Sequence, residues 1–521
     1  MMNKPNIIIL LAIMLSMNGT NVFAYDLVVE NADGKKIYYN YINNHTELEV
    51  TFEEGSNSSN SYGGNIVIPE EVTFMNRTRK VTAIGDYAFY NYGGRGRTPT
   101  SITIPKSVKY IGKDAFSSCQ SMKSVLITDL VAWCNVEIKS SPLFYAHYLY
   151  VNGICVKDLV IPNGVSSIRE NAFSGCSLES VTIPSSVTSI GDFAFSESNM
   201  ISLTIGDGVT SIGKNAFSNC NRLKKVSIPK SVTSLGNSAF SGCKSLTSVK
   251  IGNNVSAVAD KAFKGCTGLI SLTIGKNVTS IGQEAFSDCT SLPSVIIPNS
   301  VSTIDYAAFH HCKSMTSITI GTGVKTVGNS AFGNCPLNAI YISDVAAWCN
   351  IDFKDTNPLY KARHLYINGE EVKNLEIPYG VTAISKGAFQ NCSSLISVII
   401  PQSVKSIGKD AFGGIDIQDV VSLIKNPFKI DDVFSNNTFN NATLYVPVGT
   451  IKKYQEKEGW KKFWYIKEGT GPYHTCVKKA KADGGDYKIF DVGGKPLKKL
   501  QKGVNIIRYN DGRNNKVIVK H

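Results

Sequence analysis

The fold of this chain is decided by the stretch Leu223-Lys-Lys-Val-Ser-Ile-Pro-Lys-Ser-Val-Thr-Ser-Leu-Gly-Asn-Ser-Ala-Phe-Ser-Gly-Cys243. Its pattern, Leu-x-x-Val-x-Ile-Pro-x-x-Val-x-x-Ile-Gly-x-x-Ala-Phe-x-x-Cys, recurs along most of the 521 residues, and Ala-Phe occurs twelve times between Phe89 and Phe412. Successive phenylalanines of the central array stand 22 or 23 residues apart. The members of this array are Phe173, Phe195, Phe217, Phe240, Phe263, Phe286, Phe309 and Phe332. So fixed a period indicates a repeat protein, whose units bury their apolar faces by stacking.

Each repeat predicts one coil of a solenoid. Val226 and Ile228 alternate with polar residues, as in a strand that buries one face. Pro229 ends this strand because proline has no N–H for the ladder. Leu235 belongs to a second short extended stretch, and the segment leading to Phe240 favours a 3₁₀ or short helical turn. The period and the pattern are together typical of a leucine-rich-repeat solenoid, curved and built mainly of short β-strands.

The Phe row is expected to form the buried spine, and in nine repeats a cysteine follows it three residues later. The central members of this cysteine row are Cys220, Cys243, Cys266 and Cys289. Ser198 takes the same place after Phe195. Serine cannot form a disulfide, but it can replace cysteine as a small buried residue. We therefore expect reduced thiols that fill space, with occasional bridges between coils as the alternative.

Two inserts interrupt the repeat, and each lengthens the spacing between phenylalanines to 57 residues. Both inserts contain Asp-x-x-Ala-Trp-Cys-Asn, followed later by Pro-Leu and by Asn-Gly. An Asn-Gly pair between apolar runs predicts a tight hairpin. We therefore expect one enlarged coil with a hairpin at residues 129–162 and another at residues 344–378.

The N-terminal segment resembles a secretory signal. Lys4 gives it a positive start, residues 7–14 are apolar, and Val22-Phe23-Ala24 places small residues near an expected cleavage point. The apolar run is shorter than the roughly 20 residues that a membrane-spanning helix needs. These features predict export without a membrane span.

The remaining segments are expected to cap and extend the array. Asp33-Gly34 between two apolar runs predicts an N-terminal hairpin, and residues 451–463 predict an amphipathic helix with Trp460 turned inward. The expected organisation is a signal peptide at 1–24, an N-terminal β cap at 25–65, the solenoid at 66–430, a C-terminal cap at 431–470, and a linker with a small β tail at 471–521.

The sequence favours no catalytic, cofactor or metal site. The segment Gly208 to Lys214 mimics a phosphate-binding loop, but Asn215 stands where serine or threonine should hold magnesium. His310-His311-Cys312 suggests a metal, although adjacent side chains are expected to point apart. The net charge of +13 is attributed mainly to solvated faces, since the strands lack the mixed aromatic and basic pattern of nucleic-acid binders.

One row of strand residues is a candidate binding surface. In a solenoid these small polar residues would align into one stripe across the sheet. The stripe suits either an exposed sheet of copied sequence or a polar face for a protein or glycan. Its members are Ser180, Ser202, Lys225, Ser248, Ser271, Ser294 and Ser317.

The motif Ile-Pro-x-Ser-Val-x-x-Ile-Gly-x-x-Ala-Phe-x-x-Cys resembles the BspA-like leucine-rich repeats of bacterial surface proteins, over roughly residues 66–450. Phe89, Phe195 and Phe412 depart from the motif because the cysteine is lost. The resemblance implies a secreted or surface-held solenoid that mediates adhesion. The tail, with Tyr487-Lys-Ile-Phe-Asp-Val and Gly503-Val-Asn-Ile-Ile-Arg508, is similar to C-terminal sorting segments of type IX secretion, without their usual upstream strands.

Two functional hypotheses follow. The first is a monomeric, non-enzymatic scaffold or adhesin, secreted or on the outer cell surface, that binds a protein or glycan of host or bacterial surfaces. It needs no cofactor, nucleic acid or membrane span. The alternative is an exported glycan-processing or other hydrolytic enzyme that uses acids of the two inserts. Those acids are Asp129, Glu137, Asp344 and Asp352.

Overall fold

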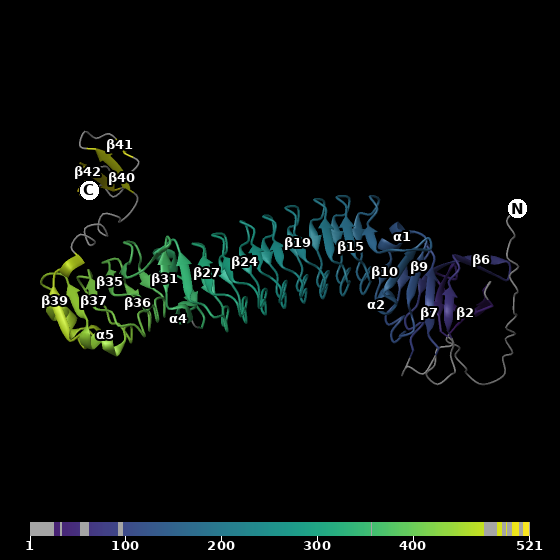
Figure 1. Cartoon of the computed structure of the whole chain (residues 1–521), viewed down its shortest axis with the longest axis horizontal. Helices are drawn as coiled ribbons and strands as arrows, with labels where there is room; N and C mark the ends of the chain where they lie inside the picture. Colours follow the sequence, from purple (N-terminus) through teal and green to yellow (C-terminus); the bar gives the residue numbers. More distant parts are fainter. Residues whose placement is uncertain are drawn as a thin grey trace. The chain divides into compact units, whose positions relative to one another are not determined.

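The computed structural model describes residues 25–31, 34–52, 62–91, 97–355 and 357–473, together with the backbone of short strands between residues 487 and 519. It divides into two compact units, of which the first ends at Leu292 and the second begins at Pro293. Figure 1 labels helices and strands of both units and colours them by residue number. The expected signal peptide and Cys476 lie outside the described residues.

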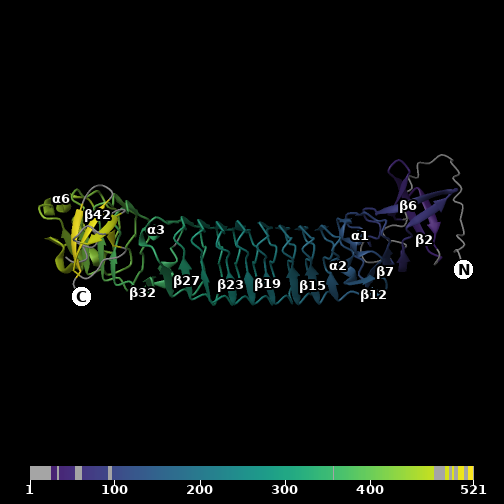
Figure 2. The ribbon, with the colours of Figure 1, turned by 90° about the horizontal axis from the view of Figure 1, so that it is seen from above.

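Each coil of the central array contributes one strand to each of two parallel sheets. The Val-x-Ile segments form what we call the first sheet, and the segments before each Gly form the second sheet. Val226 pairs with Val249, so equivalent residues of neighbouring coils lie in register (Figure 2). This arrangement confirms the predicted solenoid of stacked coils.

The strands of the first unit are as follows. Its first sheet runs through β13 (Asp158–Val160), β15 (Ser180–Ile183) and β17 (Ser202–Ile205), then through β19 (Lys225–Ser227), β21 (Ser248–Lys250) and β23 (Ser271–Thr273). Its second sheet runs through β14 (Ser167–Ile168), β16 (Ser189–Ile190), β18 (Ser211–Ile212) and β20 (Ser234–Leu235), then through β22 (Ala257–Val258) and β24 (Ser280–Ile281).

The second unit repeats this arrangement. Its first sheet contains β25 (Ser294–Ile296), β27 (Ser317–Ile320), β29 (Ala339–Ile342), β31 (Leu365–Ile367) and β32 (Glu370–Glu371), then β33 (Asn374–Glu376), β35 (Ser397–Ile400), β37 (Asp419–Ser422), β38 (Thr443–Val446) and β39 (Tyr465–Glu468). Its second sheet contains β26 (Thr303–Ile304), β28 (Thr326–Val327) and β30 (Asp352–Phe353), then β34 (Ala383–Ile384) and β36 (Ser406–Ile407).

The N-terminal segment joins the first unit through its own strands. As Asp33-Gly34 predicts, β1 and β2 pair antiparallel, and β3 then pairs parallel with β6 and so continues into the second sheet. That sheet comprises β1 (Leu27–Glu30), β2 (Lys36–Ile42), β3 (Glu47–Thr51), β5 (Glu71–Phe74), β6 (Arg77–Ile84), β8 (Tyr110–Ile111) and β10 (Glu137–Ile138). The matching first sheet comprises β4 (Gly64–Val67), β7 (Pro99–Ile104), β9 (Ser124–Ile127), β11 (Tyr148–Val151) and β12 (Ile154–Cys155).

A stack of Phe rings forms the core of each unit. Phe240 and Phe263 are fully buried, and their ring centroids lie 5.4 Å apart with the planes only 4° from parallel. The backbone repeats the same step, because the N–H of Phe240 donates to the carbonyl of Ala262 in the next coil at 2.8 Å. The coils are therefore joined through their interior as well as through the two sheets.

The cysteine row does more than fill space. The thiol of Cys243 donates to the carbonyl of Phe217 in the preceding coil, with an Sγ to oxygen distance of 3.2 Å. Ser198 makes the equivalent bond to Phe173 at 3.0 Å, which explains why serine is accepted in this row. None of the twelve cysteines in the described part of the chain belongs to a disulfide. Burial raises the pKa of Cys119 and of Cys176 to about 12, so these thiols stay protonated at neutral pH.

Each insert forms one enlarged coil, in which a tryptophan side chain donates a hydrogen bond to the next coil. The indole N–H of Trp133 donates to the carbonyl of Ala172 at 2.9 Å, and that of Trp348 donates to Ala388 at 2.8 Å. In an ordinary coil a Phe N–H of the preceding coil makes this bond. Each insert also has the hairpin predicted from Asn-Gly, β11 with β12 and β31 with β32. Their helices are α1 (Leu130–Cys134), α2 (Leu143–Ala146), α3 (Val345–Cys349) and α4 (Leu359–Ala362).

The solenoid continues past residue 430, where the sequence pattern fades. Phe434 stacks on Phe412 at 5.3 Å, and β37, β38 and β39 extend the first sheet in parallel. The predicted helix at 451–463 is shorter than expected, because the backbone becomes extended at Lys457 and Gly459, with φ of 86°, precedes a separate 3₁₀ turn. Trp460 is nevertheless fully buried, as predicted. The short helices here are α5 (Asn436–Asn441), α6 (Ile451–Glu456), η2 (Trp460–Lys462) and η3 (Gly471–Tyr473).

The tail forms a sheet of its own with the strand order β41-β40-β42-β43. Its strands pair antiparallel, in contrast to the parallel strands of the coils. They are β40 (Tyr487–Asp491), β41 (Pro496–Leu497), β42 (Gly503–Tyr509) and β43 (Asn514–Val519).

Candidate binding surface

The solvent side of the first sheet, which we call the strand face, carries the polar row identified in the sequence. In the first unit Ser180 pairs with Ser202, and Lys225 pairs with Ser248, which in turn pairs with Ser271. In the second unit Ser294 pairs with Ser317. Neighbouring strands lie about 4.8 Å apart, so the row is a closely spaced line of polar side chains.

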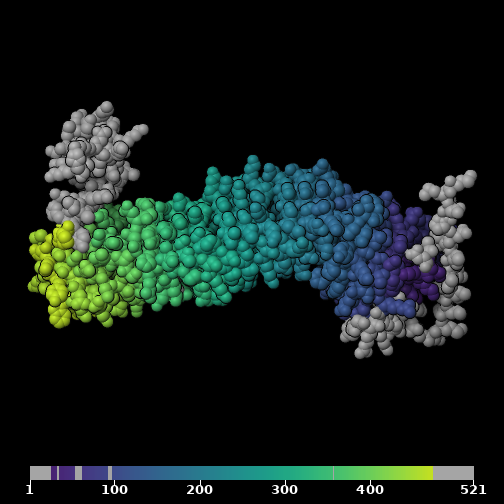
Figure 3. All heavy atoms as spheres, in the orientation of Figure 1, coloured from purple at the N-terminus to yellow at the C-terminus, as the bar shows by residue number. Residues whose placement is uncertain are grey.

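The exposure of this row varies from coil to coil. Ser202, Lys225 and Ser271 are exposed, whereas Ser180 and Ser248 are half-buried. Ser180 donates a hydrogen bond to Asp158 on the neighbouring strand, so part of the row is used within the sheet. Figure 3 shows how closely the side chains of neighbouring coils pack at the surface.

A second row lies two residues further along each strand and faces the same side. From β15 to β23 it is polar: Thr182 pairs with Thr204, and Lys250 pairs with Thr273. These four side chains are exposed. The strand face from β15 to β23 is therefore polar across two residues of each strand, whereas Val160 of β13, in the same row, is an exposed apolar residue.

The same row changes character in the second unit. There Ile296, Thr319, Tyr341 and Tyr366 follow one another in register. Ile296 is 69% exposed, and the rings of Tyr341 and Tyr366 stack with centroids 4.9 Å apart. A groove of about 450 Å³ opens beside them. The sequence analysis missed this feature because the copies of the repeat had to be aligned across the insert to find it.

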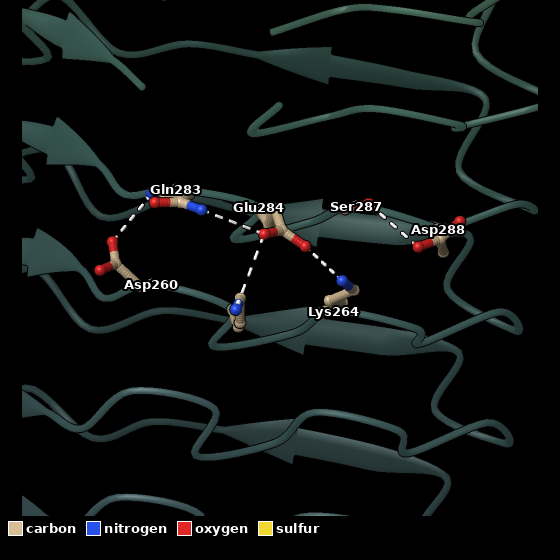
Figure 4. Close-up of polar contacts among 7 residues, drawn as sticks. Asp260, Lys264, Gln283, Glu284, Ser287 and Asp288 are labelled. Atoms are coloured by element: carbon tan, nitrogen blue, oxygen red, sulfur yellow. Dashed lines mark hydrogen bonds and ion pairs between the residues drawn. The ribbon is translucent and has the colours of Figure 1, made fainter. Parts of the chain in front are cut away.

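The charged residues of the turns have structural partners. Glu284 pairs with Lys264 and, at 3.7 Å, with Lys261 of the preceding coil, and it accepts a hydrogen bond from Gln283 (Figure 4). The hydrogen bond from Lys264 is the main reason that the pKa of Glu284 is lowered. Asp260 accepts the backbone N–H of Gln283 at 2.9 Å. These side chains connect one turn to the next.

The insert acids proposed for hydrolysis have structural partners too. Asp129 caps α1 by accepting the N–H of Ala132 at 2.9 Å, and Asp344 caps α3 in the same way. Glu137 forms an exposed ion pair with Lys139 at 2.9 Å, and Asp352 forms one with Lys354 at 2.6 Å. The four acids therefore stabilise helix ends and strand surfaces.

The two motifs that resemble ligand sites also belong to the repeat. A Cβ on Gly208 would lie 1.8 Å from the carbonyl oxygen of Ser185, so close contact between coils requires glycine. The expectation that His310 and His311 point apart is wrong. Their ring centroids are 4.0 Å apart and both Nε2 atoms contact the amide of Asn334. Nowhere in the described residues do three or more His, Cys, Asp or Glu gather as a metal site would need.

Stacked coils with in-register strands and an exposed strand face define the class: this is a leucine-rich-repeat solenoid. Comparison with known families narrows the class further. The chain matches the BspA type leucine rich repeat region in six copies, at residues 82–137, 146–270, 236–359 and 363–455. These matches cover more than half of the chain, which therefore belongs to the BspA-type leucine-rich repeat family, as its motif indicates.

Several solved structures are similar. A leucine-rich repeat protein from Bacteroides ovatus shares 25% identity and a TM-score of 0.52, over 86% of this chain and 100% of that one. A leucine rich cell surface protein from Faecalibacterium prausnitzii is 22% identical, with a TM-score of 0.39, and the match covers 87% of this chain and 97% of that one. The pneumococcal vaccine antigen PcpA is 17% identical, with a TM-score of 0.35, and the match covers 86% of this chain and 99% of that one. No curated protein matches the chain.

Across the residues that the structure describes, none of the helices has the length and apolar character needed to cross a membrane. The fold of this family is typically a scaffold that binds other proteins and is not an enzyme.

Proposed function

We propose that this protein is a secreted or surface-held binding scaffold, whose strand face contacts a protein or glycan on host or bacterial surfaces. The observation that carries this proposal is the in-register polar row through Lys225, Ser248 and Ser271. A partner that lies along this row contacts many coils at once and needs no single deep pocket. The secretory-signal pattern of residues 1–24 supports export.

The insert acids do not favour the hydrolase hypothesis. A glycoside hydrolase needs two carboxyl groups that flank one bond. Here Asp129 and Asp344 accept backbone hydrogen bonds at helix N-termini, in two different inserts. Their geometry is that of capping residues, and the scaffold remains the function that the structure supports best.

The test is a pair of charge substitutions on the strand face. Replacing Ser248 and Ser271 by Glu places two like charges on paired strands and leaves the buried positions unchanged. The matched control replaces two exposed serines of the second sheet by Glu. These are Ser234, which lies in β20, and Ser256, which directly precedes β22. Both variants and the unchanged protein are applied to an array of purified extracellular-matrix proteins and glycans.

We expect at least one array member to bind the unchanged protein and the control equally, and to bind the Ser248/Ser271 variant at least fivefold more weakly. Circular dichroism checks that both variants fold. If no member of the array binds, or if the strand-face variant binds at full strength while the control does not, the proposal is wrong.

A further inference from the structure

The groove on the strand face of the second unit is built differently from the rest of the array. It lies beside β25, β27 and β29 and reaches the turn between β31 and β32. Its lining includes Ile296, Thr319 and Tyr341 from the exposed row, Asn299 and Ser343 from the ends of coils, and Asn368 from the hairpin turn. A volume of about 450 Å³ is within the range of small-molecule sites.

Tyr341 forms an aromatic wall of this groove. In the row it stands between Thr319 and Tyr366. Its ring stacks on Tyr366, with 24° between the planes, so one face of the ring is covered. On the other side the neighbouring strand carries Thr319, a smaller side chain, and both residues line the groove.

Apart from Tyr341, the lining combines apolar side chains, such as Ile296 and Pro298, with polar side chains that are uncharged. Asn368 offers an amide that both donates and accepts, and Thr319 and Ser343 offer hydroxyl groups. Asn299 offers the N–H groups of its amide, because its Oδ1 already accepts the backbone N–H of Thr322 at 3.0 Å. No Asp, Glu, Lys, Arg or His is among the lining residues. A ring face beside uncharged hydrogen-bonding groups fits a ligand with an apolar C–H face and a rim of hydroxyl groups.

We propose that this groove binds a neutral hexose unit of a glycan, stacked on Tyr341 and hydrogen-bonded through its hydroxyl groups to the amides of Asn299 and Asn368. The inference rests on the proposed scaffold function, and it specifies the class of ligand and the site. A peptide added as an extra strand fits less well, because β27 and β29 are already paired on both sides and have no free edge.

The first insert provides an internal comparison. There the row through Thr103 and Leu126 ends on Tyr150, which is the counterpart of Tyr366. Leu126 stands where the second insert has Tyr341, so the aromatic wall is missing from this copy. We therefore expect the second insert to bind sugar and the first insert not to bind it.

The test uses the whole chain and saturation-transfer NMR titrations with glucose, galactose, N-acetylglucosamine, cellobiose, lactose and maltose. We expect at least one of these sugars to bind, with affinity that falls at least tenfold in Tyr341→Ala and persists in Tyr341→Phe. Tyr150→Ala is the matched control at the first insert and should bind as the unchanged protein does. Glucuronic acid serves as a charged probe and should bind more weakly than glucose.

The inference is overturned if none of the six neutral sugars binds, if Tyr341→Ala binds them unchanged, or if Tyr150→Ala removes binding as well. Thermal melting of each variant shows whether a loss reflects misfolding, and Tyr341→Phe keeps the test valid if Tyr341→Ala does not fold. Should matrix-protein binding respond to the Ser248/Ser271 variant while no sugar binds, the scaffold proposal stands and only the sugar site is wrong.

Discussion

At the scale of the residue, the buried Phe and Cys rows determine how one coil meets the next. The ring of Phe240 lies between those of Phe217 and Phe263, and its backbone N–H donates to Ala262 of the following coil. The thiols add a hydrogen bond to the preceding coil. A change at one of these positions therefore affects two contacts between coils.

The Phe row gives the largest expected effect of a single substitution. Phe263 is fully buried and stacks on Phe240 and Phe286, each at 5.4 Å. Phe263→Ala should lower the free energy of unfolding by about 3–5 kcal/mol, because it removes a large core side chain and leaves a cavity. Urea denaturation followed by circular dichroism measures this change, with the exposed Ser256→Ala as control. An unchanged urea midpoint would contradict the interior position of the row.

Most of the thiols should react only after unfolding, because eleven of the twelve described cysteines are buried. Burial raises the pKa of Cys119 to about 12 and that of Cys392 to about 11, so the reactive thiolate is scarce at pH 8. Cys155 is only half-buried and should react first in the native protein. Titration with Ellman's reagent without reductant should find at least twelve thiols in denaturant and few in the native state. Finding only one thiol in denaturant would show that the row is cross-linked.

At the scale of the element, turns and inserts depend on side chains that supply hydrogen bonds where the regular repeat does not. Glu284 and its lysine partners connect two turns, and each insert tryptophan satisfies a carbonyl that lacks its usual Phe donor. These interactions differ in their sensitivity to pH and to substitution, so each has its own test.

The Glu284 network should make stability depend on pH. The folded pKa of Glu284 lies below its ordinary value, so its contribution is complete above the unfolded pKa of about 4.5 and is lost as pH falls through the lower folded pKa. Glu284→Gln should therefore melt below the unchanged protein at pH 7, and the two should converge toward pH 3. Thermal melting at both values measures this, and an equal difference at pH 7 and pH 3 would contradict the role of the charge.

The two insert tryptophans should differ in importance. Asn357 supplies a second donor to Ala388 at 2.7 Å, whereas Trp133 alone is the side-chain donor found for Ala172 in the described residues. Trp133→Phe should lower the local opening free energy of its coil by about 1–3 kcal/mol, the cost of an unsatisfied buried carbonyl. Trp348→Phe should have a smaller effect. Hydrogen exchange of each coil measures both changes, and the reverse order would count against this explanation.

At the scale of the whole molecule, stability is expected to accumulate coil by coil, since each coil contacts only its neighbours. Deletion of residues 244–266 removes one complete repeat of 23 residues and rejoins equivalent positions. This variant should fold, with a slightly lower melting temperature. Deletion of residues 244–254 removes about half a repeat and should prevent cooperative folding, because it places polar residues in the interior. Equal melting curves for the two deletions would contradict the stacked-coil architecture.

The sequence by itself determined the coil, its period, the buried rows and the two hairpins. Because the repeat samples each position of the coil many times, the alternation around Val226 and the 23-residue spacing between Phe240 and its neighbours in the row were sufficient to predict the fold. Only the tertiary structure decided which groups complete the repeat where it is interrupted. Trp133 reaches Ala172 from 39 residues away, and Phe434 continues the ring stack although it lacks the Ala-Phe motif. The groove at Tyr341 likewise depends on strands from four coils lying in register, a contact between distant segments that no local pattern encodes.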